Sequence, residues 1–327
     1  MIISAYIYIG GGRFAGLRNG DAQKLTHVNF AFALVKDGKA SVAHWKNAEK
    51  VREFIRGKGP IKALLSIGGW GAGGFSPAVA TAEKREVFAQ SLVDIANDYG
   101  FDGVDLDWEY PCDGSAGIEY SHDDKPNYTA WAALLREKLG KDKLLTMAAG
   151  ASESCVSSLE IDKLVPLMDL FNIMTYDMAN WKRSSHHTSL YESEISHSMY
   201  GDKAIKQYHK AGVPMEKLTL GCAFYARVFK NVEGIDCETS DEEPGFSGGY
   251  PRTMEFVKAA GGLSYDEKAE APYAYNAKEK TFITFDNERS LKAKHKYAKA
   301  QGLAGVMFWE YSCDDEHSSL LSALAQE

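Results

Sequence analysis

The sequence contains few cysteines and neither a basic cluster nor a long apolar segment, and each absence excludes a class of protein. Its five cysteines are odd in number and form no C-x-x-C pair, so we expect isolated reduced thiols rather than a disulfide framework or a zinc site. No stretch approaches the roughly 18 apolar residues that cross a membrane. The net charge is −8 without a basic run, which argues against nucleic acids and anionic membranes as partners.

The N-terminal stretch "MIISAYIYIGGG" lacks the basic region and apolar core of a secretory signal peptide. Together with the reduced cysteines, this favours a cytoplasmic location. The alternative is a secreted protein whose signal peptide has been removed. We expect a monomer.

Short apolar runs alternate with amphipathic stretches along most of the chain. The runs span 2–10, 27–35, 61–69, 103–111, 144–151, 170–177, 218–226 and 305–312. Helical spacing of apolar residues lies between them at 47–57, 83–100, 127–140, 202–212 and 288–302. Eight strands alternating with helices predict a parallel sheet closed into a (β/α)8 TIM barrel, an α/β fold. An open doubly wound sheet is the alternative.

We expect one catalytic barrel domain over residues 1–327, with a small α+β-type insertion at 228–282 after the seventh strand. Gly, Pro, Tyr and acids dominate this segment, which predicts short strands and no strong helix. The pattern Gly69-x-Gly71-x-x-Gly74 formally matches a dinucleotide-binding fingerprint. The acid that the fingerprint needs falls near Asp94, inside a predicted helix, so we expect no nucleotide and no other cofactor.

The stretch "DGVDLDWEYP" at 102–111 places Asp105, Asp107 and Glu109 at alternate positions of a predicted strand. Such side chains share one face of the strand, here the barrel lumen, and Glu109 lies nearest the C-terminal end, where barrel active sites form. A buried polar network and a site for a hard cation are two possible interpretations. We favour acid catalysis, because closely spaced acids cannot all ionise and one of them stays protonated near neutral pH.

The pattern Asp102-x-x-Asp105-x-Asp107-x-Glu109 followed by Tyr110-Pro111 resembles the signature of glycoside hydrolase family 18, the chitinases and their relatives. "SIGGW" at 66–70, "MTYD" at 174–177, "FYAR" at 224–227 and "GVMFWEYSCDD" at 305–315 resemble further motifs of this family in the same order. The resemblance covers nearly the whole chain. It implies retaining hydrolysis of β-1,4 bonds in chitin or chitooligosaccharides, with the acetamido group of the substrate as nucleophile.

By position, the resemblance implies a catalytic role for each of five residues. Glu109 is the general acid and base, Asp107 orients the acetamido group, and Asp105 shares a proton with Asp107. Tyr176 hydrogen-bonds the acetamido carbonyl, and Asp177 helps to hold the distorted sugar. A cap at the strand end is the alternative role for Tyr176 and Asp177.

The resemblance also implies a substrate-binding set: Trp309 as the floor of the cleavage subsite, Trp70 on the leaving-group side, and Tyr6, Phe32, Met174, Tyr225 and Arg227 around them. For Tyr6, Phe32 and Met174 the alternative is core packing, and for Arg227 it is a pair with an acid. His186 and His187 resemble a metal pair, but adjacent residues rarely share a ligand face, so we expect a role in the loop and no metal site.

Ala226 departs from the glycine that is usual in this family, and the short insertion leaves endo against exo action open. Two other activities of the family compete with chitinase: endo-β-N-acetylglucosaminidase and peptidoglycan hydrolase. A non-catalytic chitin-binding lectin is disfavoured, because such relatives typically lack the acid at the position of Glu109. An unrelated metal-dependent hydrolase is the remaining alternative.

Overall fold

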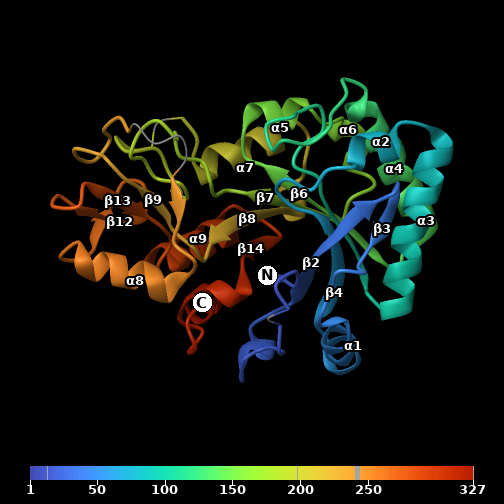
Figure 1. The fold of residues 1–327 in the computed structure, drawn as a ribbon, viewed down its shortest axis with the longest axis horizontal. Coiled ribbons are helices and arrows are strands. Elements are labelled where there is room, and N and C mark those ends of the chain that lie inside the picture. The colour runs from blue at the N-terminus through green and yellow to red at the C-terminus, as the bar shows by residue number, and fades with distance from the viewer. Residues whose placement is uncertain (13, 197, 240–243, 327) are drawn as a thin grey trace.

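The computed structural model describes residues 1–12, 14–196, 198–239 and 244–326, and its central feature is a closed parallel barrel (Figure 1). The barrel strands are β1 (Ile2–Tyr8), β2 (His27–Lys36), β4 (Lys62–Gly68), β5 (Gly103–Asp107), β6 (Leu144–Gly150), β7 (Leu170–Met174), β8 (Leu218–Ala223) and β14 (Gly305–Trp309). They pair in parallel in the order β1-β14-β8-β7-β6-β5-β4-β2, and β1 also pairs with β2. The predicted (β/α)8 barrel is confirmed, and the open sheet is wrong.

Helices connect the barrel strands on the outside of the barrel (Figure 1). They are α1 (Ala48–Gly57), α2 (Phe75–Val79), α3 (Ala82–Tyr99), α4 (Asp124–Leu139), α5 (Glu153–Ser157), α6 (Ile161–Leu164), α7 (Gly201–Lys210), α9 (Glu288–Ala300) and α10 (Ser319–Ala325). Single 3-10 turns lie at Asp21–Gln23, Met215–Lys217 and Tyr311–Cys313, and the short strand β3 (Lys39–Ser41) pairs antiparallel with β2.

The helix ends follow from local sequence, as α3 illustrates. The Thr81 side chain accepts a hydrogen bond from the main-chain N of Lys84 and so caps the first turn. Gly100 ends the helix at φ 81°, a left-handed conformation that glycine adopts without steric cost. The chain then enters β5, the strand that carries the acids.

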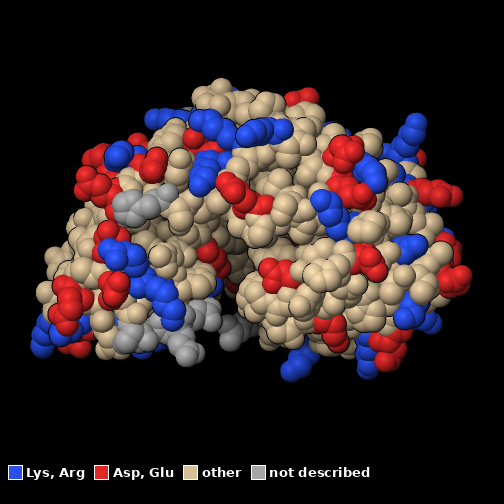
Figure 2. Space-filling view, turned by 90° about the horizontal axis from the view of Figure 1, so that it is seen from above, with Lys and Arg blue, Asp and Glu red and all other residues tan. Residues whose placement is uncertain are grey.

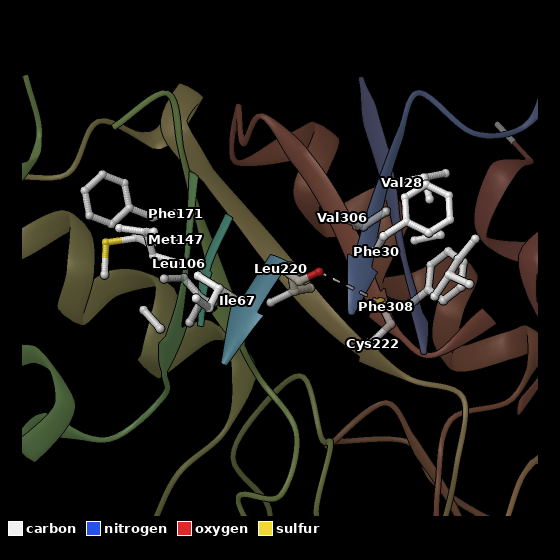
Figure 3. Close-up of a cluster of buried hydrophobic side chains, with 14 of the residues drawn as sticks. Val28, Phe30, Ile67, Leu106, Met147, Phe171, Leu220, Cys222, Val306 and Phe308 are labelled. Atoms are coloured by element: carbon white, nitrogen blue, oxygen red, sulfur yellow. Dashed lines mark hydrogen bonds between the residues drawn. The ribbon is translucent and has the colours of Figure 1, made fainter. Parts of the chain in front are cut away.

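The main hydrophobic core lies between the barrel and the helices. Leu106 and Trp108, which alternate with the acids of β5, are buried in it, and the Trp108 ring stacks on Phe75 with 5.2 Å between ring centroids. Figure 3 shows Leu106 with side chains from the neighbouring strands, among them Ile67 and Met147. Burying each large apolar side chain contributes about 1.5–3 kcal/mol to stability. This layer therefore fixes which side of β5 faces the helices, and the acids on the other side point into the barrel.

Between β8 and α9 the chain forms a second sheet beside the barrel (Figure 1). It consists of β9 (Arg227–Phe229), β10 (Gly245–Phe246), β11 (Ser264–Asp266), β12 (Ala271–Asn276) and β13 (Thr281–Thr284), all antiparallel, in the order β10-β9-β13-β12-β11. We call this segment, residues 227–284, the insertion.

The expectation that the insertion contains no strong helix is wrong, because α8 (Tyr250–Ala259) spans ten of its residues. Pro251 lies in the first turn, where its missing N–H breaks no helical hydrogen bond. Tyr250, Thr253 and Val257 form the buried face of the helix. The Gly and Pro residues just before α8 obscured this periodicity in the sequence. None of the helices in the described part of the chain is long and apolar enough to cross a membrane.

Candidate active site

A cavity of about 770 Å³ opens at the C-terminal ends of the barrel strands. Of the twelve predicted site residues, all but Asp105 line it: Tyr6, Phe32, Trp70, Asp107, Glu109, Met174, Tyr176, Asp177, Tyr225, Arg227 and Trp309. On the face drawn in Figure 2, acidic side chains are visible inside a central hollow. Residues that are far apart in the sequence are thus brought to one mouth of the barrel, the usual position of a barrel active site.

Asp105 lies beneath the cavity and is fully buried among hydrogen-bond donors. Its Oδ2 accepts hydrogen bonds from the hydroxyls of Tyr6 (2.9 Å) and Ser66 (2.7 Å). Its Oδ1 accepts from the Thr146 hydroxyl (2.6 Å) and the Asn172 amide (3.2 Å). Burial raises the pKa of Asp105, and these four donors oppose the rise. Both oxygens of Asp105 thus have hydrogen-bond partners, and the proton shared with Asp107 stays a prediction.

Asp107 is the next acid along the strand and has far less support. It is only 4% exposed, and within the described part of the chain its Oδ1 has no hydrogen-bond partner. Burial raises the pKa of Asp107 well above its usual range, and the nearby charges of Glu109 and Asp105 raise it further. A buried carboxyl oxygen without a partner, on the wall of a cavity, is ready to accept a hydrogen bond from a ligand.

Glu109 follows the end of β5 and forms part of the cavity wall. Although the cavity leaves it partly accessible, the surrounding protein raises its pKa from 4.5 to about 7 by burial. A hydrogen bond from Tyr110 opposes this shift, and the charge of Asp177 adds to it. Glu109 can therefore exchange a proton near neutral pH, as a general acid and base requires.

Asp177 is held by Arg227 in a bidentate ion pair. Arg227 Nε lies 2.6 Å from Asp177 Oδ1, and Nη2 lies 2.8 Å from Oδ2. Burial alone would raise the pKa of Asp177, but the hydrogen bonds from Arg227 and His187 outweigh it and hold the pKa well below its usual range. Of the two alternatives for Arg227, the structure thus contains the pair with an acid, and Asp177 stays ionised.

Aromatic rings form the floor and one rim of the cavity. Trp309 stacks on Phe32 with 5.5 Å between ring centroids and an interplanar angle of 13°, and Tyr6 lies 6.1 Å from it. Trp70 is 64% exposed and contacts Tyr110 edge to face at 6.4 Å. An exposed indole beside a cavity is unusual for core packing and suits the apolar face of a ligand.

The predicted roles in core packing and in ligand contact overlap for three of the residues. Tyr6, Met174 and Phe32 pack in one small apolar cluster, where Tyr6 and Met174 are buried, and all three also line the cavity. Tyr176 lines the cavity too, with its hydroxyl 3.8 Å from the sulfur of Met307. These residues therefore form both the top of the barrel core and the bottom of the site.

Sequence reasoning missed several residues of the cavity wall. The sequence motif includes Tyr110 but predicts no contact for it, and neither Trp181 nor Phe246 was predicted to lie at the site; all three line the cavity. Trp181 lies after β7, and its ring lies 5.5 Å from the Arg227 guanidinium. Phe246 belongs to β10, which pairs with β9 so that Phe246 lies opposite Arg227. No local pattern identifies Phe246, because the fold of the insertion brings it to the cavity.

Among the described residues, no group of three His, Cys, Asp or Glu side chains is placed so that it could hold a metal ion. His186 and His187 lie in a loop, and their rings contact different acids, Asp266 and Asp177 respectively.

Comparisons with known proteins agree with this geometry. The family model of the glycosyl hydrolases family 18 matches residues 6–314. Chitinase A1 of Niallia circulans is 37% identical over 284 residues, which cover 78% of this chain and 41% of that protein. Chitotriosidase-1 of Mus musculus is 32% identical over 325 residues, covering 91% of this chain and 69% of that protein. The chain thus spans about two fifths of the length of the Niallia relative.

Among solved structures, a glycoside hydrolase family 18 N-acetylglucosaminidase from Paenibacillus barengoltzii superimposes with a TM-score of 0.90 at 36% identity. The match covers 99% of this chain and 98% of that chain. A chitinase from Rhizomucor miehei gives a TM-score of 0.87 at 29% identity, with 99% of both chains covered. Both likenesses extend over the barrel and the insertion together.

Proposed function

Because this chain belongs to glycosyl hydrolase family 18, we propose that it hydrolyses β-1,4 bonds in chitin or chitooligosaccharides with retention of configuration. The observation that carries the proposal is the different support of the three acids of β5. Asp105 has four hydrogen-bond donors, Asp107 has an oxygen without a partner, and Glu109 has a pKa of about 7. Each acid is thereby suited to a different task.

In the first step, the Glu109 carboxyl protonates the glycosidic oxygen while the bond from this oxygen to C1 breaks. The acetamido carbonyl oxygen of the same sugar forms a bond to C1, which gives a positively charged oxazolinium ion, and the leaving sugar departs as an alcohol. In the second step, the Glu109 carboxylate takes a proton from water, which attacks C1 and restores the acetamido group. Two displacements at C1 leave the configuration unchanged.

The acetamido group is the nucleophile in this scheme because, among the described residues, no carboxylate is placed for that role. Asp105 lies outside the cavity wall, and Asp177 is held by Arg227. Asp107 lies deeper along the strand than Glu109, where its unpartnered oxygen accepts the acetamido N–H and stabilises the oxazolinium ion through this hydrogen bond. Tyr176 donates a hydrogen bond to the acetamido group from the other wall of the cavity.

A second candidate function is release of single N-acetylglucosamine units. It is favoured by the likeness to the Paenibacillus barengoltzii structure, which is described as an N-acetylglucosaminidase. Endo-β-N-acetylglucosaminidase and peptidoglycan hydrolase are the other activities to test. A lectin without activity is disfavoured, because Glu109 is present and its pKa lies where acid catalysis needs it.

The experiment compares fluorogenic chitobiosides and chitotriosides, glycopeptide, peptidoglycan and the matching glucose oligomers on one enzyme preparation. We expect cleavage of the 2-acetamido substrates, a β-configured first product by NMR, and essentially no cleavage of the glucose oligomers. A thiazoline analogue of the oxazolinium ion should inhibit, because it resembles the species that Asp107 and Tyr176 stabilise. An inverted first product, or comparable cleavage of glucose oligomers, would contradict the mechanism.

The matched variant is Glu109→Gln, which keeps the size of the side chain and removes its proton exchange. We expect turnover to fall roughly 10²–10⁴-fold while oligosaccharide binding persists. Near-normal activity of this variant would show that Glu109 is not the acid. The length of the released products distinguishes chitinase from release of single sugars.

A further inference from the structure

A run of polar residues after β7, Ser184–Ser189, is buried over its whole length. Such a run is costly to bury unless its side chains find partners. Two of its members, His186 and His187, are adjacent in the chain, but their rings contact different parts of the protein.

His186 faces the insertion. Its Nε2 lies 3.3 Å from Asp266 Oδ2 in β11, and its Nδ1 lies 3.4 Å from the Thr284 hydroxyl in β13. The ring packs at 5.7 Å from Tyr273 of β12. These contacts attach the loop to the second sheet and do not reach the acids of the site.

His187 faces Asp177. Its Nδ1 accepts a hydrogen bond from the main-chain N–H of Asp177 (3.4 Å) and lies 3.4 Å from Asp177 Oδ1. Main-chain contacts fix this position, since the His187 carbonyl accepts a hydrogen bond from Met178 N (3.0 Å) and the His187 N–H donates to Thr284 Oγ1 (3.3 Å). The ring is fully buried at 5.2 Å from Tyr225 and does not line the cavity.

Asp177 needs such support because of its backbone. Its φ of 55° lies in the left-handed region, which is unfavourable for a residue with a side chain and persists where the surroundings fix it. Arg227 of β9 holds the two carboxylate oxygens, and His187 contacts both the carboxylate and the main chain. We propose that His187 is a positioning residue that, as a neutral imidazole, holds Asp177 in place for the reaction.

The polar contacts of the ring lie on one side only. His187 Nε2 is buried and has no hydrogen-bond partner in the described part of the chain. Nδ1 therefore makes the contacts to Asp177, as the acceptor of its main-chain N–H and as a neighbour of its carboxylate. The charged groups around the ring are Asp177, Arg227 and Asp286, and burial lowers the pKa of His187 despite the two carboxylates, so the ring stays neutral.

The inference rests on the proposed function, because the effect of His187 on the reaction passes through Asp177 to Glu109. The charge of Asp177 helps to raise the pKa of Glu109. When His187 is truncated, Arg227 remains the main support of the carboxylate, and Asp177 is free to move away from the acids of β5. The proton on Glu109 is then lost at lower pH, which shifts the basic limb of the pH–activity profile.

The test compares His187→Ala, His187→Asn and the control His186→Asn by steady-state kinetics over a range of pH. For His187→Ala we expect kcat to fall about 10- to 100-fold with KM nearly unchanged, and the basic limb to move to lower pH. Asn can place its amide group near the position of Nδ1, where the amide oxygen can accept the Asp177 N–H, so His187→Asn should restore most of kcat and the profile. His186→Asn should lower thermal stability and leave the profile in place.

Two kinetic outcomes overturn the inference. One is a His187→Ala enzyme with wild-type kcat and an unshifted basic limb, because His187 would then matter only for stability. The other is an equal shift in His186→Asn, since the loop as a whole and not His187 would be responsible.

A measurement that needs no activity separates this inference from the proposed function. Imidazole ¹⁵N NMR of the intact protein reports the protonation state of His187, and we expect a neutral ring at neutral pH with resonances that change in Asp177→Asn. A protonated imidazolium, or resonances that the Asp177 substitution leaves unchanged, overturns the inference even if His187→Ala fails to fold. A wild-type enzyme that cleaves no 2-acetamido sugar defeats the proposed function, while the NMR result still decides the role of His187.

Discussion

Glu109, the acid that we propose for catalysis, should also destabilise the fold, and Glu109→Gln measures this cost. The pKa of Glu109 rises from 4.5 to about 7 on folding, chiefly because of burial. Each pKa unit corresponds to about 1.4 kcal/mol, so the difference amounts to about 3 kcal/mol between the protonated and ionised states. The native state binds the proton more tightly than the unfolded chain, and stability therefore falls as pH rises from about 4.5 to 7.

Glutamine is uncharged at every pH and does not carry this cost. At pH 8 we expect the free energy of unfolding of Glu109→Gln to exceed that of the wild type by up to about 3 kcal/mol. At pH 4, where Glu109 is mostly protonated in both states, the two proteins should differ by less than about 1 kcal/mol. Urea unfolding followed by tryptophan fluorescence measures both values.

The control is Asp177→Asn, for which we expect the opposite change in the free energy of unfolding. It removes the carboxylate that Arg227 contacts through two nitrogens in a largely buried ion pair, so this variant should be less stable than the wild type at pH 8. The quantity that decides is the difference in free energy of unfolding between Glu109→Gln and the wild type. If this difference were no larger at pH 8 than at pH 4, the surroundings would not raise the pKa of Glu109, and the account of its pKa would be refuted.

Three further predictions concern the rest of the site. Thr146→Val removes one of the four donors to the buried Asp105 and should lower the free energy of unfolding by about 1.5–3 kcal/mol, whereas an unchanged value would show that the Asp105 network adds nothing to stability. Trp309→Ala should weaken oligosaccharide binding in calorimetry and lower kcat together, because it removes the ring stacked on Phe32; a change in thermal stability alone would make Trp309 an ordinary core residue. Chelator treatment and dialysis should leave activity unchanged, because each proposed role belongs to a side chain or to the substrate; activity that is lost and then restored by a divalent ion would favour a metal mechanism.

The sequence was sufficient for the barrel because the relevant signals are local. A strand with an apolar run, or a helix with 3.6-residue spacing of apolar residues, can be recognised within about ten residues. The helix α3 and the strand β5 that follows it show the two patterns one after the other. The alternation of Asp105, Asp107 and Glu109 with apolar residues also fixed which side chains enter the lumen. The same local reasoning failed for α8, whose neighbouring Gly and Pro residues obscured a helix that packs through one face.

The aromatic floor of the site could be predicted in part. Trp309, Phe32 and Tyr6 lie at or near the ends of three barrel strands, so a parallel barrel places them at one mouth whatever the loops do. Whether each ring would face the ligand or the core was open from the sequence. The structure gives Tyr6 both surroundings, since it lines the cavity and donates a hydrogen bond to Asp105 from 99 residues away.

The partners of Asp177 were decided only by the tertiary structure. Arg227 lies 50 residues further along the chain and His187 lies ten, on a loop with no regular period. The insertion brings them together, since β9 carries Arg227 and a residue of β13 supports His187. Residue periodicity reports which face of an element is buried, whereas the pairing of charges across loops depends on distances that only the folded chain sets. The sequence thus determined the barrel and its row of acids, and the packing of the insertion against the barrel decided how Asp177 is held beside them.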